Sequence, residues 1–316
     1  MTSHRGGSSG PITIDLMFLD QPGVVAAYML RSLGDVALIE IGPASTAETL
    51  LSSLAKAGVA PEEVRHLLVT HIHLDHAGAA GVLASRLPNA RVYVHEIGAP
   101  HLIDPTKLVN SATRIYGGLM KRLWGTIIPV PADRVVLLHD SQVLDVGGRR
   151  IQVLYSPGHA IHHVVFHDLD DGSIFAGDMA GARLQGCGYV RPTTPPPDLD
   201  LEAWEMSLGR LIALDPTAVY LTHFGGFTDV RAHLQQLRAR LRVCESLVLK
   251  EMELGSDHTG ISMALQRAGD EELARAVDPG TISKYETASS YSMNASGYER
   301  YIRKRHPELA VPASSL

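Results

Sequence analysis

The chain has 316 residues, of which 45% are hydrophobic and 20% are charged, a composition that excludes an intrinsically disordered protein. With 34 acidic and 28 basic side chains its formal charge is −6 at pH 7, so it lacks the overall basic charge of a nucleic-acid-binding protein. Two cysteines, Cys187 and Cys244, are too few for a disulfide framework or a cysteine-rich zinc module. Since we find no secretory signal and no apolar run long enough to span a bilayer, we expect a cytoplasmic protein that binds neither nucleic acid nor membrane.

The predicted elements alternate between strands and helices. Residues 1–11 are rich in Gly and Ser and predict a disordered tail. Apolar runs bounded by Gly, Pro or Asp predict strands at 12–19, 24–30, 36–41, 66–70, 91–95, 135–138, 142–144, 151–155, 164–167, 173–175 and 218–222. Helical spacing of apolar residues predicts helices at 46–57, 76–87, 201–214, 229–250, 261–276 and 296–305.

Two segments stand outside this alternation. Leucine and isoleucine recur at mixed helical spacing within 97–125, which predicts a helical insertion between strands. Residues 255–316 predict a helical C-terminal extension. The basic run at 299–306 within it has the pattern of a solvated helix end. The strand-rich remainder favours two sheets packed face to face with helices outside.

A dense cluster of metal-ligand side chains follows the predicted strand 66–70. His71, His73, Asp75 and His76 lie within six positions. His71 and His73 alternate with Ile72, so in an extended segment both imidazoles point to one side and can reach one ion. Asp75 and His76 follow at a turn and can serve a second ion. The alternative is a polar loop with chance histidines, which the density of ligand types argues against.

Three further candidate ligands follow other predicted strands. His159 comes after the strand at 151–155, Asp178 after 173–175 and His223 after 218–222. Loops at strand ends hold reactive groups on a rigid scaffold. Taken singly, the three residues have ordinary explanations as a turn histidine, a helix N-cap and a polar strand terminus. Together with the cluster they complete a set of seven.

In this order the seven residues resemble the metallo-β-lactamase superfamily, and their arrangement is similar to its glyoxalase II-like and lactonase-like branches. The resemblance runs from about residue 12 to residue 240 and includes Thr70 before the cluster and Gly78 after it. It implies an α/β (α+β) fold, a four-layer αββα sandwich with the metals at one edge between the sheets. We therefore expect a catalytic domain at 12–254, interrupted by the insertion and followed by the extension.

The resemblance also implies a role for each ligand. Two triads and a bridging carboxylate would hold two divalent metal ions: His71, His73 and His159; Asp75, His76 and His223; and Asp178. His163 matches a family position whose side chain does not bind metal but supports a metal ligand. Five histidines and two aspartates suit several metals, of which zinc is expected and Fe or Mn are alternatives.

Two ions that share a carboxylate can hold a bridging hydroxide near neutral pH, which attacks a carbonyl or phosphoryl centre. We expect a dinuclear metal-dependent hydrolase of an ester, thioester or lactone, with Asp75 as proton shuttle as well as ligand. Its partner would be a small-molecule substrate, and it could form a homo-oligomer. The alternatives are a metal-dependent phosphodiesterase, a mono-iron oxygenase similar to the persulfide dioxygenases, and a non-enzymatic scaffold protein.

Residues that select the substrate must lie outside the seven ligands. In the insertion, Arg114, Tyr116 and Trp124 would contact substrate if this segment is a lid; a plain pair of packing helices is the alternative. The loop after Asp178 begins at a ligand and should border the pocket with Arg183, Tyr189 and Arg191. The remaining histidines without a motif are expected to be surface or structural residues: His95, His101, His139, His162, His167, His233 and His258.

Overall fold

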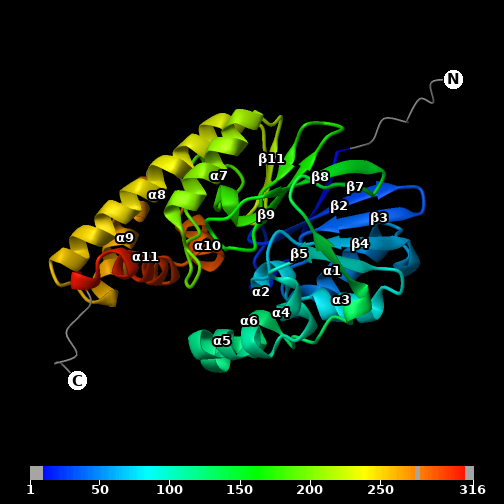
Figure 1. Ribbon diagram of the computed structural model, residues 1–316, viewed down its shortest axis with the longest axis horizontal. Coiled ribbons are helices and arrows are strands. Elements are labelled where there is room, and N and C mark those ends of the chain that lie inside the picture. Colours follow the sequence, from blue (N-terminus) through cyan, green and yellow to red (C-terminus); the bar gives the residue numbers. More distant parts are fainter. Residues whose placement is uncertain (1–9, 275–277, 310–316) are drawn as a thin grey trace.

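A computed structural model describes residues 10–274 and 278–309 (Figure 1). The strands are β1 (Ile12–Asp15), β2 (Ala26–Ser32), β3 (Asp35–Ile39), β4 (Val64–Leu68), β5 (Arg91–His95), β6 (Val135–Leu138), β7 (Val143–Val146), β8 (Arg149–Tyr155), β9 (Val164–Asp168), β10 (Ile174–Phe175), β11 (Val219–Leu221) and β12 (Gly225–Phe227). The α-helices are α1 (Ala47–Lys56), α2 (Leu74–Ala77), α3 (Ala80–Arg86), α4 (Ala99–Ile103), α5 (Thr106–Tyr116), α6 (Met120–Trp124), α7 (Leu201–Leu214), α8 (Val230–Glu253), α9 (His258–Leu273), α10 (Pro279–Ala288) and α11 (Tyr291–Arg305). Residues 1–9 of the tail predicted at 1–11 lie outside the described residues, so the disorder predicted for them stays a prediction.

Two six-stranded sheets form the centre of the fold. Their strand orders are β1-β2-β3-β4-β5-β6 and β12-β11-β10-β9-β8-β7. The chain therefore completes the first sheet before it begins the second. Figure 1 shows helices on the outer side of each sheet, which confirms the predicted four-layer α/β sandwich.

Alternate side chains of β2 belong to two different hydrophobic cores, one on each face of the first sheet. Ala26, Tyr28 and Leu30 lie in a core shared with side chains of the second sheet. Ala27 and Met29 point the opposite way, into a core with α1, α3 and α4. A third core joins the second sheet to α7, α8, α9 and α11. With both faces of both sheets buried, the strand ends remain free to carry a site.

Three of the differences from the sequence-based prediction have a local physical cause. The first strand ends at Asp15 instead of residue 19, because Met17 and Leu19 adopt left-handed backbone angles with φ of 51° and 55°. The helix predicted at 76–87 is two helices, α2 and α3, which meet near Gly78; a Cβ there would lie 2.3 Å from the carbonyl oxygen of Leu74. Strand β12 was not predicted, because a Gly-Gly pair has low strand propensity.

The insertion at 97–125 contains helices α4, α5 and α6, and the C-terminal segment contains α9, α10 and α11. Helix α11 packs on α8 and α9. In Figure 1, α10 lies above α2 and the α5–α6 pair lies below it. Among the described residues, no helix combines the length and the apolar composition that a membrane span requires.

Candidate metal centre

The structure brings the seven predicted ligands together at one edge of the two sheets. They follow the ends of β4, β8, β10 and β11, in this order: His71, His73, Asp75 and His76; His159; Asp178; and His223. Strands β10 and β11 are parallel neighbours, so their C-terminal ends carry Asp178 and His223 to the same edge. The clustering therefore follows from strand topology.

The first triad consists of three imidazoles whose nitrogens converge. His71 Nε2 lies 2.9 Å from His73 Nδ1 and 3.2 Å from His159 Nε2. His73 Nδ1 and His159 Nε2 are 3.0 Å apart. Ligand atoms on a tetrahedral zinc ion with bonds of about 2.1 Å lie about 3.4 Å apart. The triad thus has close to the spacing that one four-coordinate ion needs.

The second triad shares Asp178 with the first. Oδ1 of Asp178 lies 3.4 Å from His76 Nε2 and 3.5 Å from His223 Nε2. Its other oxygen, Oδ2, lies 3.4 Å from His159 Nε2. Asp75 Oδ2 completes the group, 3.4 Å from His223 Nε2 and 3.7 Å from His76 Nε2. Asp178 therefore presents one oxygen to each triad.

Three ligand atoms are buried without a hydrogen-bond partner in the described part of the chain. They are His76 Nε2, His223 Nε2 and Asp178 Oδ1. Leaving a buried polar atom unpaired costs about 1–3 kcal/mol, so a native protein normally satisfies it. A divalent cation would satisfy all three at once, and the imidazole and carboxylate donors suit it. The residues present therefore fit a metal centre.

Burial and neighbouring charges give the imidazoles different protonation preferences. Burial lowers the pKa of His71, His73 and His159, so these rings are neutral near pH 7 and each keeps a lone pair for a metal. Burial also lowers the pKa of His76, but three carboxylates, led by that of Glu40, outweigh burial and raise this pKa well above its usual value. A metal ion must displace that proton.

The two carboxylates of the centre stay ionised. Burial raises the pKa of Asp75, but the imidazoles of His76 and His223 outweigh burial and lower this pKa to about 2. Burial likewise raises the pKa of Asp178, and its histidine neighbours bring it well below the usual value. Both groups are thus acceptors available to a cation.

Hydrogen bonds outside the triads orient the ligand rings. The Nδ1 atoms of three ligands donate to buried acceptors: His159 to the carbonyl of Thr193 at 2.7 Å, His223 to the carbonyl of Val24 at 3.0 Å, and His76 to Glu40 at 3.0 Å. Each bond fixes the tautomer that leaves Nε2 free for a metal. Sequence reasoning missed Glu40, since a single glutamate after β3 belongs to no motif.

His163, predicted to support a ligand from behind, lies beside the first triad. Its ring stacks on that of His71, with 4.9 Å between the ring centroids. It is fully buried, and its nearest aromatic neighbours include His159 at 5.9 Å. The position is suited to holding the His71 ring in place, and the role stays a prediction.

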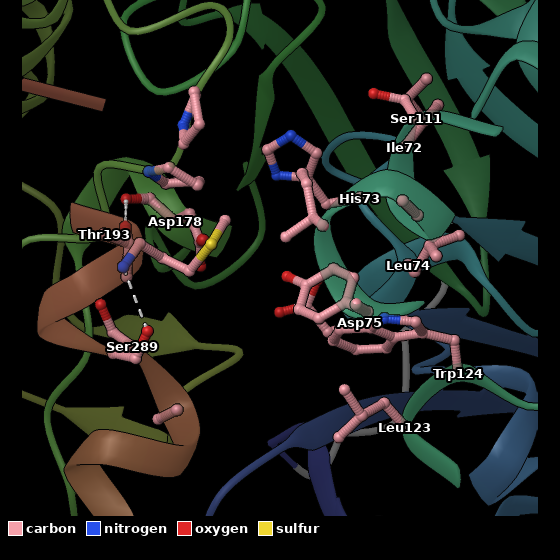
Figure 2. Close-up of a pocket in the computed structure, with 18 of the residues that line it drawn as sticks. Ile72, His73, Leu74, Asp75, Ser111, Leu123, Trp124, Asp178, Thr193 and Ser289 are labelled. Carbon is pink, nitrogen blue, oxygen red and sulfur yellow. Dashed lines mark hydrogen bonds between the residues drawn. The ribbon is translucent and has the colours of Figure 1, made fainter. Parts of the chain in front are cut away.

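A cavity of about 640 Å³ opens beside the metal centre and is lined by His73, Asp75, Asp178 and His223. Figure 2 shows Trp124 and Leu123 on one side of it and Ser289 and Thr193 on the other. Residues of the insertion therefore form one wall. The opposite wall includes residues from the end of α10 and the start of α11, which we call the C-terminal corner (283–294).

The predicted substrate residues divide into two groups. Tyr116 and Trp124 line the cavity, with 5.1 Å between their ring centroids. Arg114 is exposed and donates to the carbonyl of Asn110 in its own helix, away from the lining. In the loop after Asp178, Arg183, Tyr189 and Arg191 do not line the cavity.

Those three loop residues contact the C-terminal part of the chain instead. Arg183 pairs with Asp229 at 2.8 Å. Tyr189 and Arg191 border a separate small cavity of about 90 Å³. The Arg191 guanidinium is buried and donates to the carbonyl of Ser289 at 3.0 Å. The structure therefore does not bring these three side chains to the cavity, although the backbone N–H of Arg183 donates to the carbonyl of His223 at 2.6 Å.

Two histidines expected to be surface or structural residues line the cavity instead. His162 is buried, with its ring centroid 6.1 Å from that of His73, and His101 belongs to α4 of the insertion. Neither carries a motif that could have marked it. The C-terminal corner was missed for the same reason, because its contribution depends on how the last helices pack.

Comparison with known proteins decides the family. Residues 20–223 match the model of the metallo-beta-lactamase superfamily, which is most of the span between the first strand and the last ligand. The chain belongs to the metallo-beta-lactamase superfamily. It is therefore a metallo-hydrolase of this superfamily, as the residues of the centre predicted, and its substrate is what remains to be assigned.

Several superfamily relatives are similar over most of their length. The metallo-beta-lactamase fold-containing protein ST1585 of Sulfurisphaera tokodaii is 30% identical over 212 residues, covering 65% of this chain and 75% of the relative. Its crystal structure superposes with a TM-score of 0.62 over 74% of this chain and 87% of that chain, at 28% identity. A hydroxyacylglutathione hydrolase of a Synechococcus strain is 27% identical over 220 residues, covering 67% of this chain and 73% of the relative. The structure of TTHA1623 in a di-iron-bound form is 30% identical, with a TM-score of 0.50 over 73% of this chain and 98% of that chain.

Proposed function

We propose that this superfamily member is a dinuclear hydrolase that cleaves an ester, thioester or lactone of a small molecule. The observation that carries the proposal is the orientation of Asp178, whose two oxygens face the two triads separately. Two divalent ions bound there would lower the pKa of a shared water and polarise the attacked carbonyl. We propose zinc for both ions, with iron as the alternative that a di-iron relative supports.

Asp75 is the proposed proton carrier. Its side chain is 22% exposed and lines the cavity, whereas that of Asp178 is 6% exposed. In the reaction the carbonyl carbon gains an oxygen from water and loses its bond to the leaving sulfur or oxygen. The water's proton passes to Asp75 and from there to the leaving atom, so the carboxylate is regenerated.

The proposed site does not require a nucleophilic side chain. The two thiols are remote from this role, since neither lines the cavity beside the metal centre, and burial raises the pKa of both Cys187 and Cys244. Both cysteines are free, which supports the expected cytoplasmic location as part of the proposal.

Metal content and a substrate panel test the proposal together. We expect two ions per chain by elemental analysis of active protein, and hydrolysis of a thioester, ester or lactone that stops when a chelator removes the metal. One iron per chain, with oxygen uptake in the presence of a persulfide, would establish the oxygenase alternative instead. Turnover of phosphodiesters alone would establish the phosphodiesterase.

A further inference from the structure

The cavity beside the metal centre is lined by apolar side chains from segments far apart in the chain. Six of them are Phe18, Ile97, Leu108, Ile115, Trp124 and Ile161. Ile97, Ile115 and Ile161 are 45%, 49% and 55% exposed, so they contribute little to the protein's own core. Exposed apolar side chains gathered beside a reactive centre are typical of a site for an apolar ligand.

Charged side chains are few in the same cavity. Apart from metal ligands and other histidines, the described residues that line it include one base, Lys107, and two acids, Asp198 and Glu286. Glu286 already accepts a hydrogen bond from Arg191 at 3.3 Å. A glutathione conjugate, which carries two carboxylates and one ammonium group, would meet one cation and two carboxylates outside the metal centre. The charge distribution therefore favours a neutral substrate.

Two polar side chains of the C-terminal corner, Asn294 and Ser289, are bonded to each other and to the backbone of residues 192–194. The Asn294 amide donates to the carbonyl of Pro192 at 3.1 Å and to Ser289 Oγ at 3.0 Å, and it accepts from the backbone N–H of Thr194 at 2.7 Å. Ser289 Oγ donates to the carbonyl of Pro192 at 3.0 Å. These two side chains therefore have little hydrogen-bonding capacity left for a polar ligand.

We propose that the cavity binds a neutral substrate with an apolar acyl chain, whose scissile carbonyl lies at the metal centre and whose chain runs along α5 and α6. This inference rests on the proposed function and names its substrate class. The volume of about 640 Å³ is that of a site for a drug-sized molecule.

Chain length is the variable that tests the substrate class. The probes are N-acetylcysteamine thioesters and ethyl esters with unbranched acyl groups of two to ten carbons, and glutathione thioesters with the same acyl groups. Each buried methylene should raise kcat/KM about two- to fourfold until the cavity is filled. At equal chain length the glutathione conjugate should be at least about tenfold slower. A flat or falling dependence on chain length, or faster turnover of the glutathione conjugates, overturns the inference.

A matched pair of variants tests the wall itself. Ile115 lines the cavity and is 49% exposed, whereas Leu119 belongs to the same insertion, is 54% exposed and does not line it. Ile115→Asn should lower kcat/KM for the octanoyl substrate about five- to tenfold more than for the acetyl substrate. Leu119→Asn should change neither. If the two substitutions change kcat/KM for the long-chain substrate equally, Ile115 does not contact the acyl chain and the insertion is not part of the binding site.

A binding measurement separates this inference from the proposed function. N-phenyl-1-naphthylamine, a neutral apolar fluorophore, should bind the metal-free protein, be displaced by decanamide and not by glutathione, and bind more weakly to Ile115→Asn. If the metal-loaded protein hydrolyses none of the substrates but this binding pattern holds, the hydrolase proposal fails and the apolar cavity stands. Absence of binding, or displacement by glutathione, overturns the inference whatever the activity.

Discussion

Glu40 accepts a hydrogen bond from Nδ1 of His76 at 3.0 Å, and both side chains are buried. The bond holds one ring hydrogen of His76 on Nδ1, so the proton that a metal must displace is the one on Nε2, which faces Asp178 and Asp75. The other carboxylate oxygen of Glu40 accepts from the backbone N–H of Thr70 at 3.3 Å, at the start of the ligand cluster. One carboxylate thus orients a ligand and anchors the segment that carries it.

Glu40→Gln should weaken the second metal site selectively. The amide keeps the shape of the side chain but removes the charge that favours donation from His76. Affinity for the second ion should fall about 10- to 100-fold, and affinity for the first should change little. Titration of metal-free protein with zinc against a chromophoric chelator measures both. Glu96→Gln is the control, because Glu96 is exposed and faces His139. Unchanged affinity for both ions in Glu40→Gln would contradict the orienting role.

Asp178→Asn should reduce metal content below two ions per chain and lower turnover by orders of magnitude. The substitution preserves the shape of the group but removes the charge shared between the triads. Elemental analysis after dialysis and kcat measured with metal in excess report the two effects. Asp198→Asn is a matched control in the same cavity, since Asp198 contacts neither triad. If the Asp178→Asn variant keeps two ions and normal turnover, the carboxylate does not bridge.

Asn294→Ala should destabilise the fold and loosen the cavity wall without removing metal. The buried N–H of Thr194 would be left unpaired, at about 1–3 kcal/mol, and the carbonyl of Pro192 and the hydroxyl of Ser289 would each lose one bond but keep the bond between them. Urea unfolding should show a loss of about 2–4 kcal/mol in total, and KM should rise. Ser296→Ala, which removes only a bond to the carbonyl of Ser292 in the same helix, should stay within about 0.5 kcal/mol of the wild type. Equal stability of the two variants would contradict the anchoring role of Asn294.

His233 should make the metal-free protein less stable in acid. Burial lowers the pKa of His233 to about 4, and its Nε2 donates to the carbonyl of Ala180 at 2.8 Å. Because the folded pKa lies below the unfolded value of about 6.5, its stabilising effect is complete above pH 6.5 and is lost as pH falls towards 4. Between pH 7.5 and pH 5 the loss should be about 2 kcal/mol.

Urea unfolding of the wild type and of His233→Gln at these two pH values isolates the effect. Glutamine keeps a donor for Ala180 but does not titrate, so the variant should lose about 2 kcal/mol less than the wild type over this range. The other histidines titrate equally in both proteins and cancel in the comparison. If the two proteins lose stability in parallel, His233 is not the titrating group.

The ligands could be predicted because their signals are local. Each ligand or group of ligands directly follows an apolar strand, and four of the seven lie within six positions of one another. Glu40 gave no such signal, since its link to His76 depends on how the loop after β3 packs on α2. Both walls of the cavity also depend on tertiary packing and leave no local signal in the sequence. Their residues meet only once the insertion and the C-terminal corner pack across the sheet edge.

The loop after Asp178 shows how proximity in sequence can mislead. Ala182 and Arg191 form an antiparallel bridge, so the segment between them folds back on itself, and the side chains of Arg183, Tyr189 and Arg191 do not line the cavity. The Arg191 side chain then stacks on the ring of Tyr291, with its guanidinium carbon 3.9 Å from the ring centroid. A prediction from sequence had no means of detecting a turn that only one bridge defines.

The C-terminal corner has a consequence for the time course of synthesis. All seven ligands precede residue 224, whereas the corner begins at residue 283. The ribosome therefore makes every predicted metal ligand before it makes this wall of the cavity. A nascent chain therefore passes through a stage at which the seven predicted ligands and the insertion wall are made but the opposite wall of the cavity is not.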